Sequence, residues 1–294
     1  MNSYQTKIVA LLLAASCVTT ACDAQTDSSK SLVTRGKEVA RDVRLIGRIV
    51  NPRLSESSGV VASRQFPGVF WSHTDGGGPK KQYLFAMDAE GDSLGEFFIG
   101  DALITDWEDI AIDDQKHLFI ADTGNNDLRR AEVLVHELDE PAPKSELRFI
   151  SPRRSWRLRW PGEVFDCESL FIWQGHGYLV TKVFKDARAQ IFRFPLTDAK
   201  DPLVLDLVAT TKIESPVTGA DISPDGRLLA LVAKSGAFLY RIDGDVLKAG
   251  KGKPHQLKFR NDQIEGCAFV PEGLIATSES RQIYLFTDEA FRQK

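Results

Sequence analysis

One motif recurs five times in this chain at intervals of about fifty residues, and it constrains the fold more than any other feature. It is a polar position, most often glutamate, followed by a small or polar residue and then by apolar residues typical of a buried strand. The copies are LSESSGVVA at 54–62, TDWEDIAID at 105–113, FDCESLFIW at 165–173, SPVTGADIS at 215–223 and DQIEGCAFV at 262–270. The aligned residues are Glu56, Glu108, Glu168, Thr218 and Glu265, and subtraction of their numbers gives intervals of 52, 60, 50 and 47 residues. A repeat of this length, made of short strands, is the signature of a β-propeller.

Further strand-like segments follow each copy of the motif. In the second repeat, DIAIDD, HLFIADTG, VLVHELDE and LRFISPRRSWRLRW predict four strands. Between such segments, DAEGDS at 88–93, SPDGR at 223–227 and IDGD at 242–245 place glycine where a hairpin needs positive φ. We therefore expect an all-β, five-bladed propeller, because a sixth blade would need an undetected repeat within the 60-residue interval.

The last repeat has room for only about three strands before the chain ends. The segment VRLIGRIV at 43–50 is strand-like and precedes the first motif. We expect this N-terminal strand to complete the last blade and close the ring. The propeller domain is accordingly predicted to span residues 43–294.

The N-terminus has the features of an export signal. Lys7 precedes an apolar run over 8–15, and small residues follow, which predicts a signal peptide over 1–21. The run is too short for a permanent membrane helix, and no later stretch approaches the ~20 apolar residues that a helix needs to span a bilayer. We expect a soluble domain joined to the N-terminus by a polar, flexible tether over 22–42.

Small residues before a cysteine resemble a bacterial lipoprotein signal, in which the cysteine is lipidated. The resemblance implies lipidation of Cys22, because TTAC leaves an apolar region of normal length whereas cleavage before Cys17 would shorten it. Ordinary secretion, with cleavage near Ala21 or Ala24, is the alternative. Asp23 resembles an inner-membrane retention signal, but the choice between inner and outer membrane stays open. We expect an exported, periplasmic protein that contacts the membrane through its lipid anchor alone.

Composition excludes some classes of partner. The chain has 294 residues, 43% of them hydrophobic, which suffices for a large core. A formal net charge of −4, with Lys and Arg spread along the sequence, gives no case for nucleic acid. Beyond position 22 the cysteines are Cys167 and Cys267, which we expect to be separate buried thiols rather than a disulfide. We expect a monomer.

In a propeller the first strand of each blade lines the central channel, so the aligned glutamates would meet at one mouth of it, on the face we call the top. Asp106 and Asp166 precede their glutamates by two residues and would point the same way. Close carboxylates either raise one another's pKa or bind a cation. Since the aligned positions offer oxygen ligands and no Cys or His, we expect calcium held by Glu56, Glu108, Glu168, Thr218 and Glu265. The alternative is an empty channel whose acids bind water and backbone amides.

The second strand of each blade runs back to the same face, so residues at its end also reach the mouth. Those ends read WSHTDGGG, ADTGNN, VTKVFKD, VAKSG and TSESR. They add Lys234 and Glu279 as weaker candidates. The expected ligand-binding residues are His73, Asp75, Asp106, Asp122, Asn125, Asn126, Asp166 and Lys182. Within this set, the candidates for catalysis are His73, Asp75, Asp122 and Lys182, since a cation beside such groups can polarise a phosphate or carbonyl and activate water. Otherwise Asp, Asn and Gly simply form turns here.

TDWEDIA followed by LFIADTGNNDLRR resembles bacterial envelope propellers, and the architecture is similar to the five-bladed SdiA-regulated lipoproteins. The ring of Glu and hydroxyl residues is similar to that around the axial calcium of calcium-activated apyrases. These resemblances extend over about 43–290 and imply an envelope propeller with a central calcium. The chain lacks a clear apyrase nucleotide-binding segment.

Two further motifs are interpreted as structural. GDSLG at 91–95 matches a serine-nucleophile pattern, but that elbow requires a strand before it and a helix after it, whereas Ser93 lies in a predicted hairpin. RRSWRLRW at 153–160 alternates Arg and Trp, as a nucleic-acid or anionic-lipid patch does. We expect it instead to be an outer strand whose Arg side chains face solvent while its Trp side chains pack inward.

These features predict a binding module that holds a small molecule or a protein at its top face. The alternative is a calcium-dependent hydrolase of phosphate esters or lactones that uses the same face, and a scaffold without a pocket is a third possibility. The fold cannot choose among them, because propellers perform all three roles. The discriminating feature is whether His73 and Asp75 lie within reach of the cation.

Overall fold

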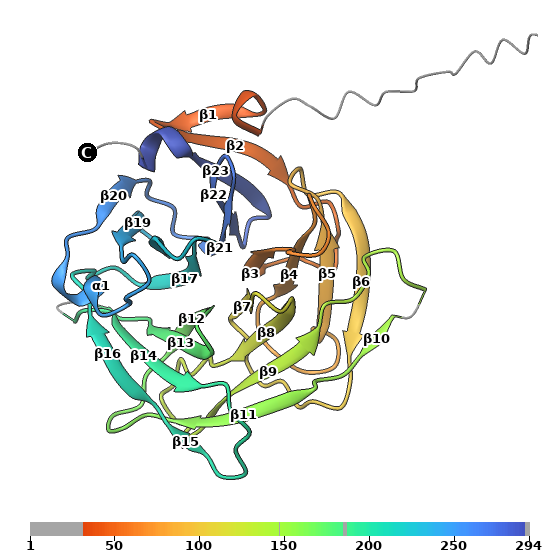
Figure 1. Cartoon of the computed structure of the whole chain (residues 1–294). Coiled ribbons are helices and arrows are strands. Elements are labelled where there is room, and N and C mark those ends of the chain that lie inside the picture. Colours follow the sequence, from red (N-terminus) through yellow and green to blue (C-terminus); the bar gives the residue numbers. More distant parts are fainter. Residues whose placement is uncertain (1–31, 147, 185–186, 292–294) are drawn as a thin grey trace, which may run out of the picture. The chain divides into compact units, whose positions relative to one another are not determined.

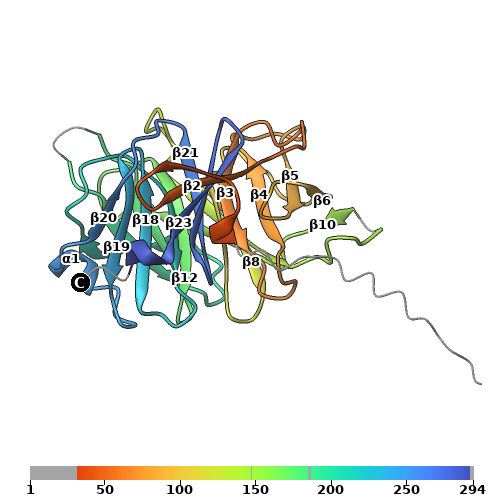
Figure 2. The ribbon, with the colours of Figure 1, turned by 90° about the horizontal axis from the view of Figure 1, so that it is seen from above.

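The computed structural model describes residues 32–146, 148–184 and 187–291, and these residues form five small sheets arranged in a ring (Figure 1). Figure 2 shows the ring from its edge, with the strands running between its two faces. The fold is an all-β, five-bladed propeller, which confirms the prediction. None of the helices in this described part of the chain is long and apolar enough to cross a bilayer.

Each blade starts at the channel and continues outward. Blade 1 contains β3 (Ser57–Ala62), β4 (Phe70–Thr74), β5 (Tyr83–Met87) and β6 (Ser93–Ile99). Blade 2 contains β7 (Asp109–Ile112), β8 (His117–Asp122), β9 (Val133–Asp139) and β11 (Arg154–Arg159). Blade 3 contains β12 (Cys167–Trp173), β13 (His176–Thr181), β14 (Gln190–Pro195) and β16 (Asp206–Thr210). Blade 4 contains β17 (Val217–Ile222), β18 (Leu228–Ala233), β19 (Gly236–Arg241) and β20 (His255–Lys258), with the short helix α1 (Lys248–Lys251) before β20.

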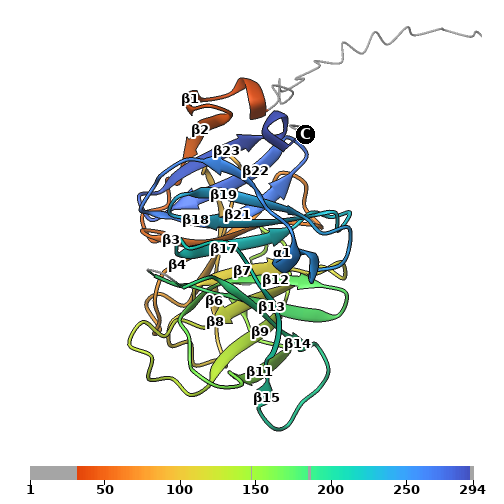
Figure 3. The same ribbon diagram turned by 90° about the vertical axis from the view of Figure 1, so that its left-hand side faces the viewer.

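Blade 5 joins the two ends of the described chain. From the channel outward it contains β21 (Ile264–Val270), β22 (Gly273–Ser278), β23 (Gln282–Thr287), β2 (Val43–Arg48) and β1 (Lys37–Ala40). The antiparallel pairing of β2 with β23 sets Val43 opposite Phe286, and Figure 3 shows the two strands side by side. Closure of the last blade by the N-terminal strand is therefore confirmed.

The sheet begins earlier than the sequence indicated. Strand β1 pairs with β2 and lies within the predicted tether 22–42, so the ordered sheet starts at Lys37 and not at Val43. The 3₁₀ turn η1 (Leu32–Thr34) precedes it, and η2 (Asp288–Phe291) follows the last strand. The predicted signal peptide 1–21, with Cys17, and the predicted lipidation site Cys22 lie outside the described residues.

Connecting segments cover the outer edges of the first two blades. β10 (Phe149–Ile150) runs parallel to β6, and β15 (Leu203–Val204) runs parallel to β11. In β11 the Trp156 side chain is 2% exposed and its indole donates to the Thr197 carbonyl at 2.8 Å, while the arginines alternate outward. The interpretation of RRSWRLRW as an outer strand is confirmed.

The other structural interpretations also hold. Ser93 opens strand β6 directly after a turn in which the Asp88 carboxylate accepts the backbone N–H of Asp92 at 2.9 Å. A strand therefore follows the serine where a nucleophile elbow needs a helix. Cys167 and Cys267 are buried free thiols, as expected.

Small residues after the motif let the inner strands approach one another closely. A methyl group on Gly266 would lie 2.3 Å from the Val60 nitrogen. The fully buried Asp109, the first residue of β7, accepts the Leu170 N–H of blade 3 at 2.8 Å, and the Ala220 N–H of blade 4 also bonds to it. Asp109 thus links blades 2, 3 and 4 beneath the mouth of the channel.

Candidate metal centre

The strand register identifies which residues of the five blades are equivalent. In four blades the residue after the second strand donates its backbone N–H to the residue that precedes the inner strand. These bonds run from Asp75 to Glu56, Lys182 to Asp166, Lys234 to Pro216 and Glu279 to Gln263, at 2.9, 2.9, 3.2 and 2.9 Å. Two residues after each of these acceptors, an equivalent position occurs on the inner strand of every blade, and Glu108 occupies it in blade 2. The five equivalent residues are Ser58, Glu108, Glu168, Thr218 and Glu265. We call this set the mouth ring.

The alignment of Glu56 with the other glutamates was wrong by two residues, because Ser58 occupies that position in blade 1. Glu56 is instead equivalent to Asp166, and its side chain is 52% exposed beside Lys81, whose Nζ lies 3.8 Å away. The hydroxyl members of the mouth ring bind the next blade: Ser58 donates to the Glu108 carbonyl at 2.9 Å and Thr218 to the Ile264 carbonyl at 2.8 Å. They link blades rather than face a ligand.

The mouth-ring glutamates are buried and close enough to interact. Burial, followed by the charge of Glu168, raises the pKa of Glu265 to about 9. Burial likewise raises the pKa of Glu168 to about 7, against the opposing effect of Lys182. Glu108 has its pKa raised well above the usual value by burial and then by Glu168. These carboxylates need a counter-charge to ionise at neutral pH.

Lysines supply that counter-charge on one side of the mouth. The Lys182 ammonium group forms an ion pair with Glu168 and lies 4.0 Å from Asp166. Lys234 Nζ lies 3.8 Å from Glu265 Oε1. In the half of the mouth formed by blades 3 to 5, each glutamate therefore has a lysine of the chain beside it.

In the half formed by blades 1 and 2, the nearby cations Lys81 and Arg130 form ion pairs with Glu56 and Asp122, and no ion pair of the described residues includes Asp75, Asp106 or Glu108. Carboxylate oxygens of Asp75, Asp106 and Glu108 lie within 4.8 Å of one another, and we call these residues the acid trio. The described residues provide no hydrogen-bond or ion-pair partner for the Glu108 carboxylate, although the residue is 3% exposed. Burial, and then Asp75, raise the pKa of Asp106 to about 6, while Arg130 lowers it. The trio has the composition and spacing of a site for a hard cation.

The absence of a side chain at Gly124 provides the space that the acid trio occupies. A methyl group on Gly124 would lie 2.1 Å from Glu108 Oε1 and 2.4 Å from Asp106 Oδ2. The loop that carries Gly124 is held by Asp122, which is fully buried and accepts the Asp106 N–H at 2.7 Å. Asp122 also forms an ion pair with Arg130 at 3.1 Å, a cation that the sequence interpretation did not select.

Three of the predicted ligand-binding residues, His73, Asn125 and Asn126, are not part of the acid cluster at the mouth. His73 is fully buried, its ring centroid lies 4.4 Å from that of Trp107, and burial lowers its pKa to about 3. Asn125 is buried and folds its own loop: its N–H donates to Asp166 at 2.8 Å and its side-chain oxygen accepts the Arg130 N–H at 2.8 Å. Asn126 is exposed. Asp75 therefore belongs to the acid trio, whereas His73 does not.

No protein-family model and no curated protein matches this sequence. Among solved structures, one from a nidogen–laminin complex is 12% identical with a TM-score of 0.46, covering 76% of this chain and 72% of that one. A gluconolactonase from Xanthomonas campestris is 12% identical with a TM-score of 0.46, covering 78% of this chain and 71% of that one. The Dos1 propeller is 15% identical with a TM-score of 0.38, covering 76% and 52%. At such low similarity these structures carry no inference about function.

Proposed function

We propose that this protein is a calcium-binding propeller that uses its loaded mouth to hold a small molecule or a protein partner. The observation that carries the proposal is the Glu108 carboxylate, which is 3% exposed and faces Asp75 and Asp106. Without a cation, mutual repulsion and burial oppose the ionisation of these groups. A bound cation removes that penalty.

The proposed ion lies off the axis, toward blades 1 and 2. Lys182 and Lys234 already neutralise the opposite side and would repel a cation there. Calcium suits an all-oxygen site, and because it takes six to eight ligands, the acid trio leaves coordination positions for water or for an oxygen of the ligand. Glu168, Thr218 and Glu265 are accordingly not among its proposed ligands.

His73 and Lys182 do not supply the base that the hydrolase alternative assigned to them. A metal-assisted hydrolase needs a group beside the ion that can accept a proton from water. His73 is buried against Trp107. Burial lowers the pKa of Lys182, but Glu168, Asp166 and Glu265 together raise it above the usual value, so Lys182 stays protonated. The described mouth residues therefore do not supply the histidine on which the hydrolase alternative depended.

Export and lipidation at Cys22 are part of the proposal, and the lipoprotein-like signal supports them. The lipid would attach the protein to the inner or outer membrane from the periplasmic side. Mass spectrometry of the mature N-terminus tests this: a lipid-modified Cys22 is expected, and an unmodified chain that starts at Gln25 contradicts it.

Titration calorimetry of the metal-free protein tests calcium binding. We expect saturable binding that stabilises the fold by about 2.7 kcal/mol once free calcium reaches about 100 times the dissociation constant. Glu108→Gln should weaken binding at least about tenfold, since it removes one of the charges that attract the ion. Glu56→Gln is the matched control, because that glutamate lies on the same face but outside the trio, and it should leave affinity unchanged. Absence of binding, or equal losses in both variants, contradicts the proposal.

A further inference from the structure

Three exposed apolar side chains lie around the mouth. Leu103 is 90% exposed, Leu128 53% and Phe184 60%, and we call these residues the apolar rim. They belong to three segments: the connection between β6 and β7, the loop after β8 and the loop after β13. A single exposed apolar side chain is common, but several large ones on one face mark an interaction surface.

The segments that carry the two leucines also build the proposed cation site. Leu103 lies three residues before Asp106, a member of the acid trio, and the Asp106 N–H donates to Asp122 at 2.7 Å. Leu128 lies two residues before Arg130, which forms an ion pair with the same Asp122 at 3.1 Å. Because Asp122 holds both segments, the two leucines flank the acid trio.

Leu128 has a backbone conformation that is unusual for a leucine. Its φ is 56°, in the left-handed region that favours glycine and asparagine. The side chain is also exposed, so it contributes little to the core. Neither burial nor backbone preference therefore explains a leucine at this position, whereas contact with an apolar phase would.

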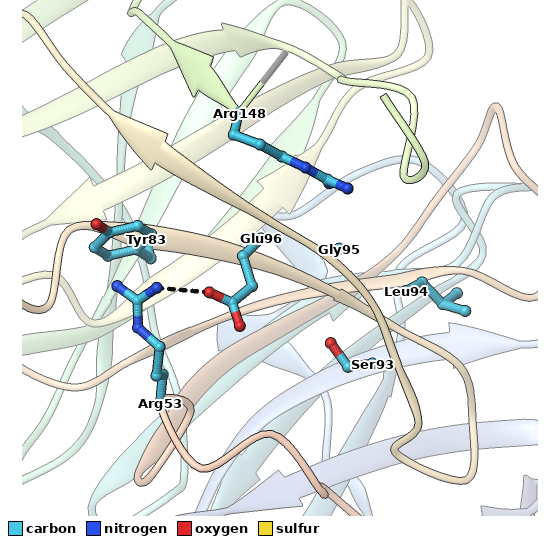
Figure 4. A pocket seen from close by; sticks show the side chains of 7 residues that line it. All are labelled: Arg53, Tyr83, Ser93, Leu94, Gly95, Glu96 and Arg148. Carbon is cyan, nitrogen blue, oxygen red and sulfur yellow. Dashed lines mark hydrogen bonds and ion pairs between the residues drawn. The ribbon is translucent and has the colours of Figure 1, made fainter. Parts of the chain in front are cut away.

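The outer side of blade 1 lacks this combination of groups. Its surface depression is lined by Arg53, Tyr83, Ser93, Leu94, Gly95, Glu96 and Arg148 (Figure 4). Glu96 Oε2 accepts a hydrogen bond from Arg53 at 2.7 Å, and Oε1 accepts one from Asn51 at 2.7 Å. The carboxylate of this lining is thus bonded to the protein itself and is not left to hold a cation, in contrast to the acid trio.

The charge of the mouth indicates what the apolar rim would contact. Without a metal ion, the acid trio repels an anionic surface, whereas bound calcium offsets most of that charge. Calcium takes six to eight oxygen ligands, so phosphate oxygens of lipid headgroups can fill the positions that the trio leaves. Leucine and phenylalanine side chains beside such an ion can enter the boundary between headgroups and acyl chains.

We propose that the calcium-loaded mouth docks on an anionic phospholipid bilayer, with lipid phosphate oxygens on the ion and the apolar rim inserted among the lipids. This inference rests on the calcium site of the proposed function and names the ligand of that site. It adds a second membrane contact to the proposed anchor at Cys22.

The proposed anchor makes even a weak contact sufficient. Cys22 precedes Leu32, the first described residue, by ten positions, which a fully extended chain spans in at most about 35 Å. A lipid on Cys22 would therefore keep the propeller close to the bilayer and raise the effective concentration of the mouth at its surface.

Co-sedimentation with vesicles tests the docking. The chain from Asp23 onward is used, because it contains every described strand and carries no lipid. We expect binding to vesicles that contain phosphatidylglycerol when calcium is present, and binding at least about tenfold weaker in EDTA or to pure phosphatidylcholine. Leu103→Asn combined with Leu128→Asn should weaken vesicle binding at least about tenfold, because two inserted side chains are lost. Calorimetry should show unchanged calcium affinity for this double variant.

Leu247→Asn is the matched control. Leu247 is 49% exposed and lies three residues after Gly244, whose N–H donates to Gly226 in the hairpin at the opposite end of β17 from Thr218. Its replacement should leave vesicle binding unchanged. Asparagine suits the φ of Leu128, so the double variant should keep its fold, and Phe184→Ser gives an independent loss of vesicle binding from another blade.

The outcomes separate the docking from the calcium site. Calcium binding without vesicle binding would overturn the docking and leave the calcium site in place, whereas absence of calcium binding would remove both. Vesicle binding that persists in EDTA, equal binding by the parent and the double variant, or an equal loss in Leu247→Asn would also overturn the docking.

Discussion

At the scale of single residues, the chemistry of the mouth depends on the side chain that follows the second strand of each blade. That position is Asp75 in blade 1 but Lys182 in blade 3 and Lys234 in blade 4. An aspartate there adds a third carboxylate next to Asp106 and Glu108, whereas each lysine pairs with a mouth-ring glutamate. The same backbone position therefore contributes a carboxylate to the proposed cation site on one side of the mouth and a lysine beside a glutamate on the other.

The space at Gly124 allows a test of the acid trio that changes no charge. Gly124→Ala would place its methyl group 2.1 Å from Glu108 Oε1, so the carboxylates must move apart. Since metal sites need their ligand geometry held closely, we expect calcium affinity to fall at least about tenfold in calorimetry. Gly162→Ala is the control, because a methyl group there meets nothing within 4 Å. Unchanged calcium affinity in Gly124→Ala would exclude the trio as the binding site.

The Lys182–Glu168 pair gives a second prediction. Lys182→Met leaves a buried carboxylate without its cation, and removal of one partner of a buried pair costs about 3 kcal/mol. The loss should be clear in urea denaturation at about pH 8 and smaller near pH 5, because burial raises the pKa of Glu168 to about 7 and the group is then neutral. Lys182→Met combined with Glu168→Gln should recover most of the stability. A double variant as unstable as the single one would contradict this account.

At the scale of the strands, the sequence was enough to predict the blade number, the closure and the motif of four inner strands. It could not fix the register of blade 1, because a shift by two residues keeps a side chain on the same face of a strand. The acid in SESSG therefore matched the pattern at Glu56 although Ser58 occupies the position. The prediction that His73 binds a ligand at the mouth was not met, because side chains alternate along a strand. His73 lies one residue before the end of β4, and its ring packs against Trp107 of the neighbouring blade. The pairing of Lys234 in blade 4 with Glu265 in blade 5 could not be predicted from spacing within a blade.

Strand β2 permits a test of ring closure. Removal of residues 1–48 deletes β1 and β2, which exposes the edge of β23 and the partners of the buried side chains Val43 and Ile46. We expect a marked fall in melting temperature or aggregation on size exclusion, since an unprotected edge strand pairs with other chains. Removal of residues 1–36 keeps both strands and serves as the control. Equal melting temperatures for the two truncations would show that β2 does not close the ring.

At the scale of the whole molecule, the ring brings acidic side chains of several blades together at one mouth of the channel. Beneath them, the fully buried Asp109 accepts backbone hydrogen bonds from blades 3 and 4. The carboxylates of the mouth thus come from different blades. Their protonation therefore affects the stability of the whole ring rather than that of one sheet.

This coupling predicts how stability depends on pH. The pKa values of Asp106, Glu168 and Glu265 are raised to about 6, 7 and 9, mainly by burial, so the folded protein holds protons that the unfolded chain has released. Stability of the metal-free protein should thus be greatest near pH 4 to 5 and fall as the pH rises toward about 9. The proposed calcium would bind the ionised trio, so the stabilisation that it adds should grow with pH. Thermal melts between about pH 5 and pH 8, in EDTA and in excess calcium at constant ionic strength, measure both effects. A melting temperature in EDTA that rises over this range, or a calcium effect that shrinks, would show that the mouth carboxylates are not held in their neutral form.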